Sequence, residues 1–177
     1  MKHKLIITAV LCIAALFFAA CAEEEPVILK SSTISVDSLR FEIPMGFIIE
    51  EEKSDETTTY YESELHEVSK VIYKKLENNG SFETLDAEST LPDLKAYLKD
   101  TYLANSNPHL TEEKRIEIDG RPAYKYIVSY NLYDAPMIHS HCYIEDGDVI
   151  HHIEYVGVEE EGYDHSFALY FDNIRFE

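Results

Sequence analysis

Residues 123–156 read AYKYIVSYNLYDAPMIHSHCYIEDGDVIHHIEYV, and this segment sets the architecture that the rest of the chain completes. Apolar and polar residues alternate along it with a period of two, which predicts β-strands. Breaks in the alternation place strands at 123–133, 138–144 and 149–156, with Asp146-Gly147 as a tight turn. Strands joined by tight turns run antiparallel, so this segment predicts the centre of an antiparallel sheet.

The residues on either side extend this pattern and add helices. Further strands are predicted at 34–36, 39–43, 47–51, 57–62, 68–77 and 115–118, with turns at Asp37-Ser38 and Asp119-Gly120. A helix is predicted over 91–104, because apolar residues recur there at helical spacing: Leu91, Leu94, Leu98 and Tyr102. Thr90, just before them, is a suitable N-cap. A closing helix is predicted over 163–174. The expected fold class is α+β, an antiparallel β-sheet flanked by helices, in a single domain over 32–177.

Two short motifs and the order of elements resemble the PsbP-like superfamily. The segment LRFEIPMGF at 39–47 resembles the opening of that family, and IDGRPAY at 118–124 resembles its hairpin entry. A mid-chain helix, a paired hairpin and a C-terminal helix follow in the family's order. The resemblance covers 32–177, and DcrB-type bacterial lipoproteins are among the relatives. It implies an α/β/α sandwich with a non-enzymatic binding or assembly role, and it carries over no catalytic residue.

The N-terminus predicts export and lipidation. A basic start, MKHK, precedes an uncharged run over 5–20, which is shorter than the roughly 20 apolar residues of a spanning helix. Ala19-Ala20-Cys21 ends that run and resembles a lipobox. We therefore expect 1–20 to be a signal peptide, Cys21 to carry the lipid, and 21–31 to form an acidic tether outside the cytoplasm. The alternative is an ordinary signal peptide or an uncleaved anchor in which Cys21 is incidental.

Charge and cysteine content restrict the partners and the chemistry. The chain has a formal net charge of −19, and losing Lys2 and Lys4 with a signal peptide would make it more negative. Such a charge repels phosphate backbones, which excludes nucleic acid as a partner and leaves proteins, peptides and cations. Contact with a lipid bilayer is expected through acyl chains on Cys21. Cys142 would then be the one remaining thiol, so no internal disulfide is expected.

A histidine-rich hairpin is the candidate for a metal site. With Asp146-Gly147 as the turn, His141 would face His152 and His139 would face Glu154. These four side chains would then project from one face of the sheet, and three nitrogens with one oxygen suit zinc or another divalent ion. The alternative is a set of hydrogen-bonded sheet residues that bind no metal.

Catalysis has little support in the sequence. Cys142 and His151 could form a nucleophile–base pair, but nothing supplies an oxyanion hole, and a buried inert thiol is the favoured interpretation. The sequence contains no G-x-S-x-G, H-E-x-x-H or Walker motif. Three hypotheses follow, in order: a lipid-tethered binding or accessory domain that is not an enzyme, a divalent-metal-binding lipoprotein, and a hydrolase whose site no motif reveals.

Overall fold

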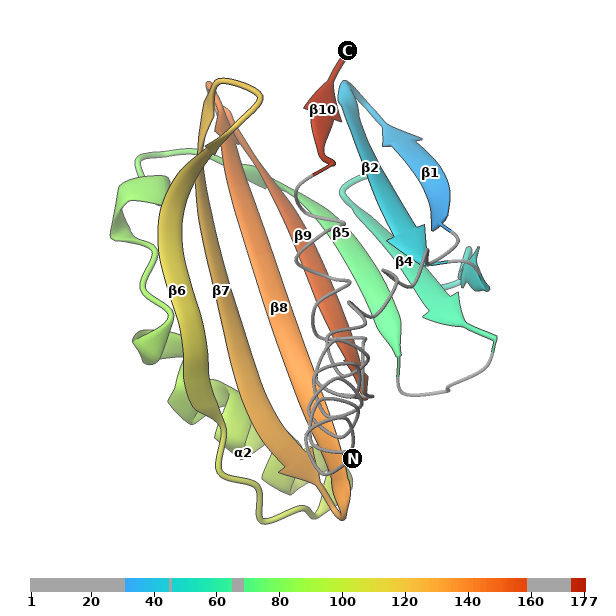
Figure 1. Ribbon diagram of the computed structural model, residues 1–177, viewed down its shortest axis with the longest axis vertical. Coiled ribbons are helices and arrows are strands. Elements are labelled where there is room, and N and C mark those ends of the chain that lie inside the picture. The colour runs from blue at the N-terminus through green and yellow to red at the C-terminus, as the bar shows by residue number, and fades with distance from the viewer. Residues whose placement is uncertain (1–30, 45, 65–68, 159–172) are drawn as a thin grey trace, which may run out of the picture.

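The computed structural model describes residues 31–44, 46–64, 69–158 and 173–177. Within these ranges the chain forms a seven-stranded sheet, a three-stranded sheet and the helix α2 (Leu91–Tyr102). The helix covers one face of the large sheet, and the small sheet packs on the opposite face (Figure 1). The predicted antiparallel α+β class is therefore confirmed.

Both sheets are antiparallel throughout. The large sheet has the order β3-β4-β5-β9-β8-β7-β6, and the small sheet has the order β1-β2-β10. The strands of the large sheet are β3 (Phe47–Ile49), β4 (Thr58–Ser63), β5 (Lys70–Glu77), β6 (His109–Ile118), β7 (Arg121–Leu132), β8 (Ala135–Asp146) and β9 (Val149–Val158). Those of the small sheet are β1 (Ser31–Val36), β2 (Leu39–Pro44) and β10 (Arg175–Phe176).

Two hairpins turn where the sequence predicted. Asp37 has a φ of 54° between β1 and β2, and Asp119 and Gly120 have φ values of 50° and 76° between β6 and β7. At Asp119-Gly120 both central residues have positive φ, which gives a turn whose twist matches that of the flanking strands, and Asp-Gly adopts it at low cost; between β1 and β2 only Asp37 of the two central residues has a positive φ. The local sequence therefore sets these two connections.

The large sheet separates two hydrophobic cores. On one face, Phe41 of β2 and Tyr73 of β5 stack with ring centroids 6.3 Å apart between the two sheets. On the other face, Leu98 of α2 packs among the tyrosines of β7. A strand covered on both faces is buried along its length. This explains why β9 is buried even at its polar positions.

The helix forms as its apolar spacing predicted, but its start differs in detail. Leu98 is buried, and Leu91, Leu94 and Tyr102 pack partly buried beside it. Thr90 occupies the N-cap, yet its hydroxyl donates to the Ala87 carbonyl at 2.7 Å, because a 3₁₀ turn over Glu88–Thr90 leads directly into the helix. The helix ends at Tyr102, and Leu103 follows as its C-cap with the left-handed φ of 54°.

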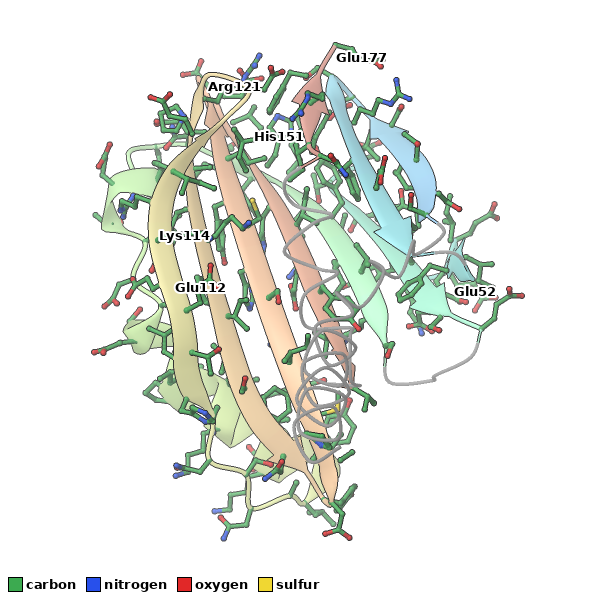
Figure 2. The ribbon with its side chains drawn as sticks, in the orientation of Figure 1. Glu52, Glu112, Lys114, Arg121, His151 and Glu177 are labelled. Carbon is green, nitrogen blue, oxygen red and sulfur yellow. The ribbon has the colours of Figure 1, made fainter. Side chains whose placement is uncertain are left out.

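The two edges of the large sheet disfavour further strand pairing. β6 carries the ion pair between Lys114 and Glu112, with 2.7 Å between Nζ and Oε1, and Figure 2 shows both side chains along this strand. At the opposite edge, β3 has three residues. Charged or very short edge strands discourage edge-to-edge association.

Several predictions concern residues outside the described ranges. The signal peptide at 1–20, Cys21 and the tether up to residue 30 are among them, and Ser31 already begins β1. Most of the predicted closing helix also lies outside, although its last residue, Ile174, is buried just before β10. No helix in the described part of the chain is long and apolar enough to cross a membrane.

Candidate functional site

Four polar side chains of the β8–β9 hairpin share the face of the large sheet that α2 covers. His139 and His141 come from β8, and His152 and Glu154 come from β9. They share a face because alternate residues of a strand project on the same side. The structure brings together all four residues that the sequence proposed as metal ligands.

The pairing across this hairpin differs from the predicted one. The turn is Gly147-Asp148 rather than Asp146-Gly147, so every pair is shifted by two residues. His141 therefore lies opposite Glu154 instead of His152. A shift of two residues leaves each side chain on its expected face, whereas a shift of one would have reversed it.

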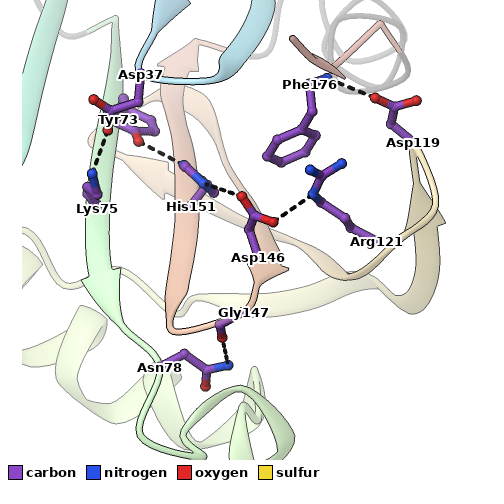
Figure 3. Close-up of polar contacts among 10 residues, drawn as sticks. All are labelled: Asp37, Tyr73, Lys75, Asn78, Asp119, Arg121, Asp146, Gly147, His151 and Phe176. Atoms are coloured by element: carbon purple, nitrogen blue, oxygen red, sulfur yellow. Dashed lines mark hydrogen bonds and ion pairs between the residues drawn. The ribbon is translucent and has the colours of Figure 1, made fainter.

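The neighbouring strand β5 holds this turn in its register. At the end of β5, Asn78 donates from Nδ2 to the Gly147 carbonyl at 2.9 Å and from its backbone N–H to the Asp148 carbonyl at 2.8 Å. Figure 3 shows the first of these bonds. Asp-Gly and Gly-Asp both suit two-residue turns, so a contact from a distant strand selects the register here.

A buried polar cluster results, which we call the histidine–glutamate cluster: His139, His141, His152, Glu154 and Lys74. Glu154 uses both carboxylate oxygens, one 2.8 Å from His139 Nε2 and the other accepting from Lys74 Nζ at 2.8 Å. His141 Nδ1 lies 3.0 Å from His152 Nε2, so one imidazole donates to the other. These two hydrogen bonds replace the hydration that the Glu154 carboxylate loses on burial.

Aromatic rings enclose the histidines. The ring centroids of Tyr126 and His141 are 4.4 Å apart, those of Tyr143 and His152 are 4.0 Å apart, and those of His139 and His141 are 4.1 Å apart. Such stacks bury large flat surfaces and restrict ring rotation. The imidazoles are therefore fixed in orientation before any ligand arrives.

Burial sets the charge states inside the cluster. Loss of hydration lowers the pKa of His152 to about 3 and holds that of His141 well below its usual range, so both are neutral near pH 7. Burial alone would raise the pKa of Glu154, but the hydrogen bond and charge of His139 outweigh it and hold that pKa far below its usual range. The cluster thus combines an ionised carboxylate with the neutral imidazoles of His141 and His152.

Part of the cluster meets the first requirement of a metal site. One ligand atom each from His139, His141 and Glu154 lie within 4.8 Å of one another. His139 Nδ1 is buried and has no hydrogen-bond partner among the described residues. The neutral imidazole of His141 is a ready ligand, since no proton must be displaced from it. Two contacts work against metal binding. The ammonium group of Lys74 already neutralises the Glu154 carboxylate, and His152 Nε2 is already hydrogen-bonded to His141.

A cavity of about 410 Å³ lies beside the cluster, between α2 and the large sheet. Its walls include the apolar side chains of Ile72, Leu94, Leu98, Met137 and Val156. His139, Glu154 and Lys74 form its polar floor. A mostly apolar cavity with a few fixed polar groups is typical of small-ligand sites, and this one lies within their usual size range.

The sequence patterns did not predict that Lys74 joins this site, and so they did not predict the ion pair between Lys74 and Glu154 at the floor of the cavity. Lys74 lies opposite His152 in the β5–β9 ladder. The period-two pattern of β5 places Ile72 and Lys74 on one face and Tyr73 on the other, so the face of Lys74 could be predicted from the sequence. The strand with which β5 pairs could not be predicted, because β5 and β9 are far apart in the chain.

The pair Cys142 and His151 does not form a catalytic arrangement. Cys142 is completely buried and lies opposite Ile153. His151 Nδ1 is 2.8 Å from the Tyr73 hydroxyl, and its Nε2 is 3.7 Å from Asp146 Oδ2, as Figure 3 shows. One ring nitrogen is therefore hydrogen-bonded to Tyr73, and the other faces the Asp146 carboxylate.

The contacts of His151 belong to a polar chain at the interface of the two sheets. Arg121 Nε donates to Asp146 Oδ1 at 2.9 Å, and this bond lowers the pKa of the Asp146 carboxyl. The Arg121 guanidinium also lies 3.6 Å from the centroid of the Phe176 ring, which belongs to β10. Burial lowers the pKa of His151. This chain of contacts fastens the small sheet to the large one (Figure 3).

Comparison with known proteins agrees with the architecture. No protein-family model matches the sequence, and no curated protein matches it. Among solved structures, the chain is similar to cyanobacterial PsbP (CyanoP) from Synechocystis sp. PCC 6803, with a TM-score of 0.58 and 12% identity over 89% of this chain and 97% of that chain. It is also similar to the Ran-binding protein Mog1p of Saccharomyces cerevisiae, with a TM-score of 0.51 and 11% identity over 79% of this chain and 83% of that chain. The chain therefore has the α+β fold shared by PsbP and Mog1.

Proposed function

We propose that this chain is a lipid-anchored protein outside the cytoplasm that binds a small ligand between α2 and the large sheet and does not act as an enzyme. The observation that carries the proposal is the cavity of about 410 Å³ whose floor is the ionised Glu154, fixed by Lys74 and His139. Fixed polar groups at the base of apolar walls orient a ligand without further rearrangement.

The lining indicates the kind of ligand. Leu94, Leu98 and Met137 favour an apolar body of modest size. Lys74 and Glu154 neutralise each other at the floor, and Lys70 and Asp93 add one charge of each sign to the lining, so the lining offers no excess charge of either sign to a charged ligand. The best match is an apolar molecule or peptide side chain with one neutral polar end that donates to or accepts from the floor.

The anchoring part of the proposal is supported by the N-terminal pattern. An uncharged run ends in Ala19-Ala20-Cys21, and the first strand begins ten residues later at Ser31. A short tether between the lipid and the fold would keep the binding domain beside the membrane and raise its local concentration there. Capture or assembly benefits from that placement.

Filling the cavity from the helix tests the binding role. Leu94 lines the cavity, whereas Leu91 lies on the same helix and does not. With N-phenylnaphthylamine as a fluorescent probe, we expect saturable binding to the wild-type chain and to Leu91→Trp, and loss of binding in Leu94→Trp. Circular dichroism establishes that both variants are folded. Equal binding by both variants, or no binding by the wild type, would remove the proposal.

A divalent-metal site is the second candidate, favoured by the closeness of His139, His141 and Glu154 and by His139 Nδ1, which has no hydrogen-bond partner within the described ranges. Zinc would then raise the melting temperature of the wild type and of His109→Ala, in which an exposed histidine is removed, but not that of His141→Ala. Lys74→Met should tighten zinc binding, because it removes the competing ammonium group. An unchanged melting temperature of the wild type would exclude this candidate.

A further inference from the structure

A second cavity, of about 660 Å³, lies beyond the C-terminal end of α2. It is formed by the loop 103–107, the first residues of β6, the last residues of β7 and the β7–β8 turn, at the lower end of the sheet in Figure 1. Tyr130 is the one lining residue that it shares with the cavity above the histidine–glutamate cluster. It is therefore a separate site, and its size suits a small ligand.

The lining of this second cavity combines apolar side chains with neutral polar groups. Asn105, Asn107, Asn131 and Ser129 contribute amide and hydroxyl groups. None of the described residues that line it is Asp, Glu, Lys or Arg, although these four types make up 28% of the chain. Amides and hydroxyls both donate and accept hydrogen bonds, so they match a neutral ligand with many hydroxyl groups. An anionic ligand would find no lysine or arginine among the described lining residues, which include His109; the Lys95 ammonium group lies just outside and donates to Asn107 Oδ1 at 3.1 Å.

Two large side chains at the edge of this second cavity, those of Leu103 and Tyr133, are exposed and belong to residues with positive φ. Leu103 and Tyr133 have φ values of 54° and 55°, a region that bulky residues rarely adopt, and they are 88% and 69% exposed. The Tyr133 hydroxyl donates to the Tyr102 carbonyl at 2.5 Å, which fixes the ring while leaving most of it exposed. Held backbone strain of this kind is concentrated at binding and catalytic sites.

We propose that this second cavity binds a neutral oligosaccharide, with the exposed face of Tyr133 stacked against a sugar ring and the asparagine amides bonded to its hydroxyls. A sugar ring combines an apolar C–H face with neutral groups that donate and accept. A purely apolar ligand would leave the amides of Asn105 and Asn131 without partners, and a phosphorylated one would lack a cation among the lining residues. The proposal does not rest on the function proposed for the other cavity.

Calorimetric titration of the full chain with maltotriose, cellotriose and triacetylchitotriose tests this site, with a heparin tetrasaccharide as the anionic comparison. Asparagine tolerates a positive φ, so Tyr133→Asn removes the ring while preserving the fold. We expect at least one neutral sugar to bind, with about tenfold weaker binding to Tyr133→Asn. Tyr97→Asn, which removes an exposed tyrosine outside this cavity, should bind as the wild type does. Failure of all three neutral sugars to bind, preference for heparin, or unchanged binding by Tyr133→Asn would overturn the proposal.

Discussion

Mild acid is expected to destabilise this protein through His141 and His152. Both side chains are buried, and His141 Nδ1 lies 3.0 Å from His152 Nε2, so two protonated imidazoles would repel each other there. Burial lowers the pKa of His152 to about 3 and that of His141 well below its usual range. In the unfolded chain each returns to a pKa of about 6.5. Below that pH the unfolded chain binds more protons than the folded one, so stability falls as the pH falls.

The size of the effect follows from this difference in proton binding. Between about pH 7.5 and about pH 5, each histidine that stays neutral in the fold lowers the free energy of unfolding by about 2 kcal/mol, or about 4 kcal/mol for the pair. The double variant His141→Phe/His152→Phe removes both groups together and keeps the ring stacks. Its stability near neutral pH should change by about 1 kcal/mol or less, because no buried polar atom loses its partner.

Urea denaturation at a series of pH values, followed by circular dichroism, measures this difference. The wild type should lose stability steadily below about pH 6.5, and the double variant should lose about 4 kcal/mol less over the same range. His109→Gln, which removes an exposed histidine, should retain the wild-type slope. Parallel curves for the wild type and the double variant would refute the assignment of two buried neutral imidazoles.

Two further predictions concern packing and charge. Gly157→Ala should cost about 1–3 kcal/mol in thermal unfolding, because a methyl group there overlaps the hydroxyl of Tyr155; a similar cost in the Tyr155→Leu background would contradict this reason. Lys74→Met should cost about 2–4 kcal/mol in urea denaturation, because Glu154 stays buried without its ammonium partner. Lys74→Met/Glu154→Leu should recover most of that loss, and an equal loss in the double variant would count against the buried ion pair.

Local patterns were sufficient to predict most of the fold. The alternation in 123–133 placed Tyr124, Tyr126 and Val128 on one face, and the structure buries these three together against the α2 side. The Asp119-Gly120 turn and the apolar stripe of α2 depend on neighbouring residues alone. Side-chain direction and turn chemistry act over a few residues, so the sequence shows them directly.

The parts that failed depend on contacts between distant segments. The register of the β8–β9 hairpin is selected by Asn78 at the end of β5, which no local pattern indicates. Lys74 joins the cluster only because β5 pairs with β9. The same pairing covers one side of β9 and so helps to bury His152 and Glu154. The candidate metal ligands could therefore be predicted from the sequence, but their charged partner and the cavity beside them could not.

Native mass spectrometry of the full-length protein, extracted from its own membrane in mild detergent, tests the central claim most directly. A lipid-anchored binding protein should appear as a chain beginning at Cys21 with covalent acyl mass, and it should carry a non-covalent small molecule that Leu94→Trp no longer retains. An unmodified Cys21 thiol with the N-terminal segment still attached would contradict the anchor. A wild-type chain free of any bound molecule, or one retained equally by Leu94→Trp, would contradict the binding site.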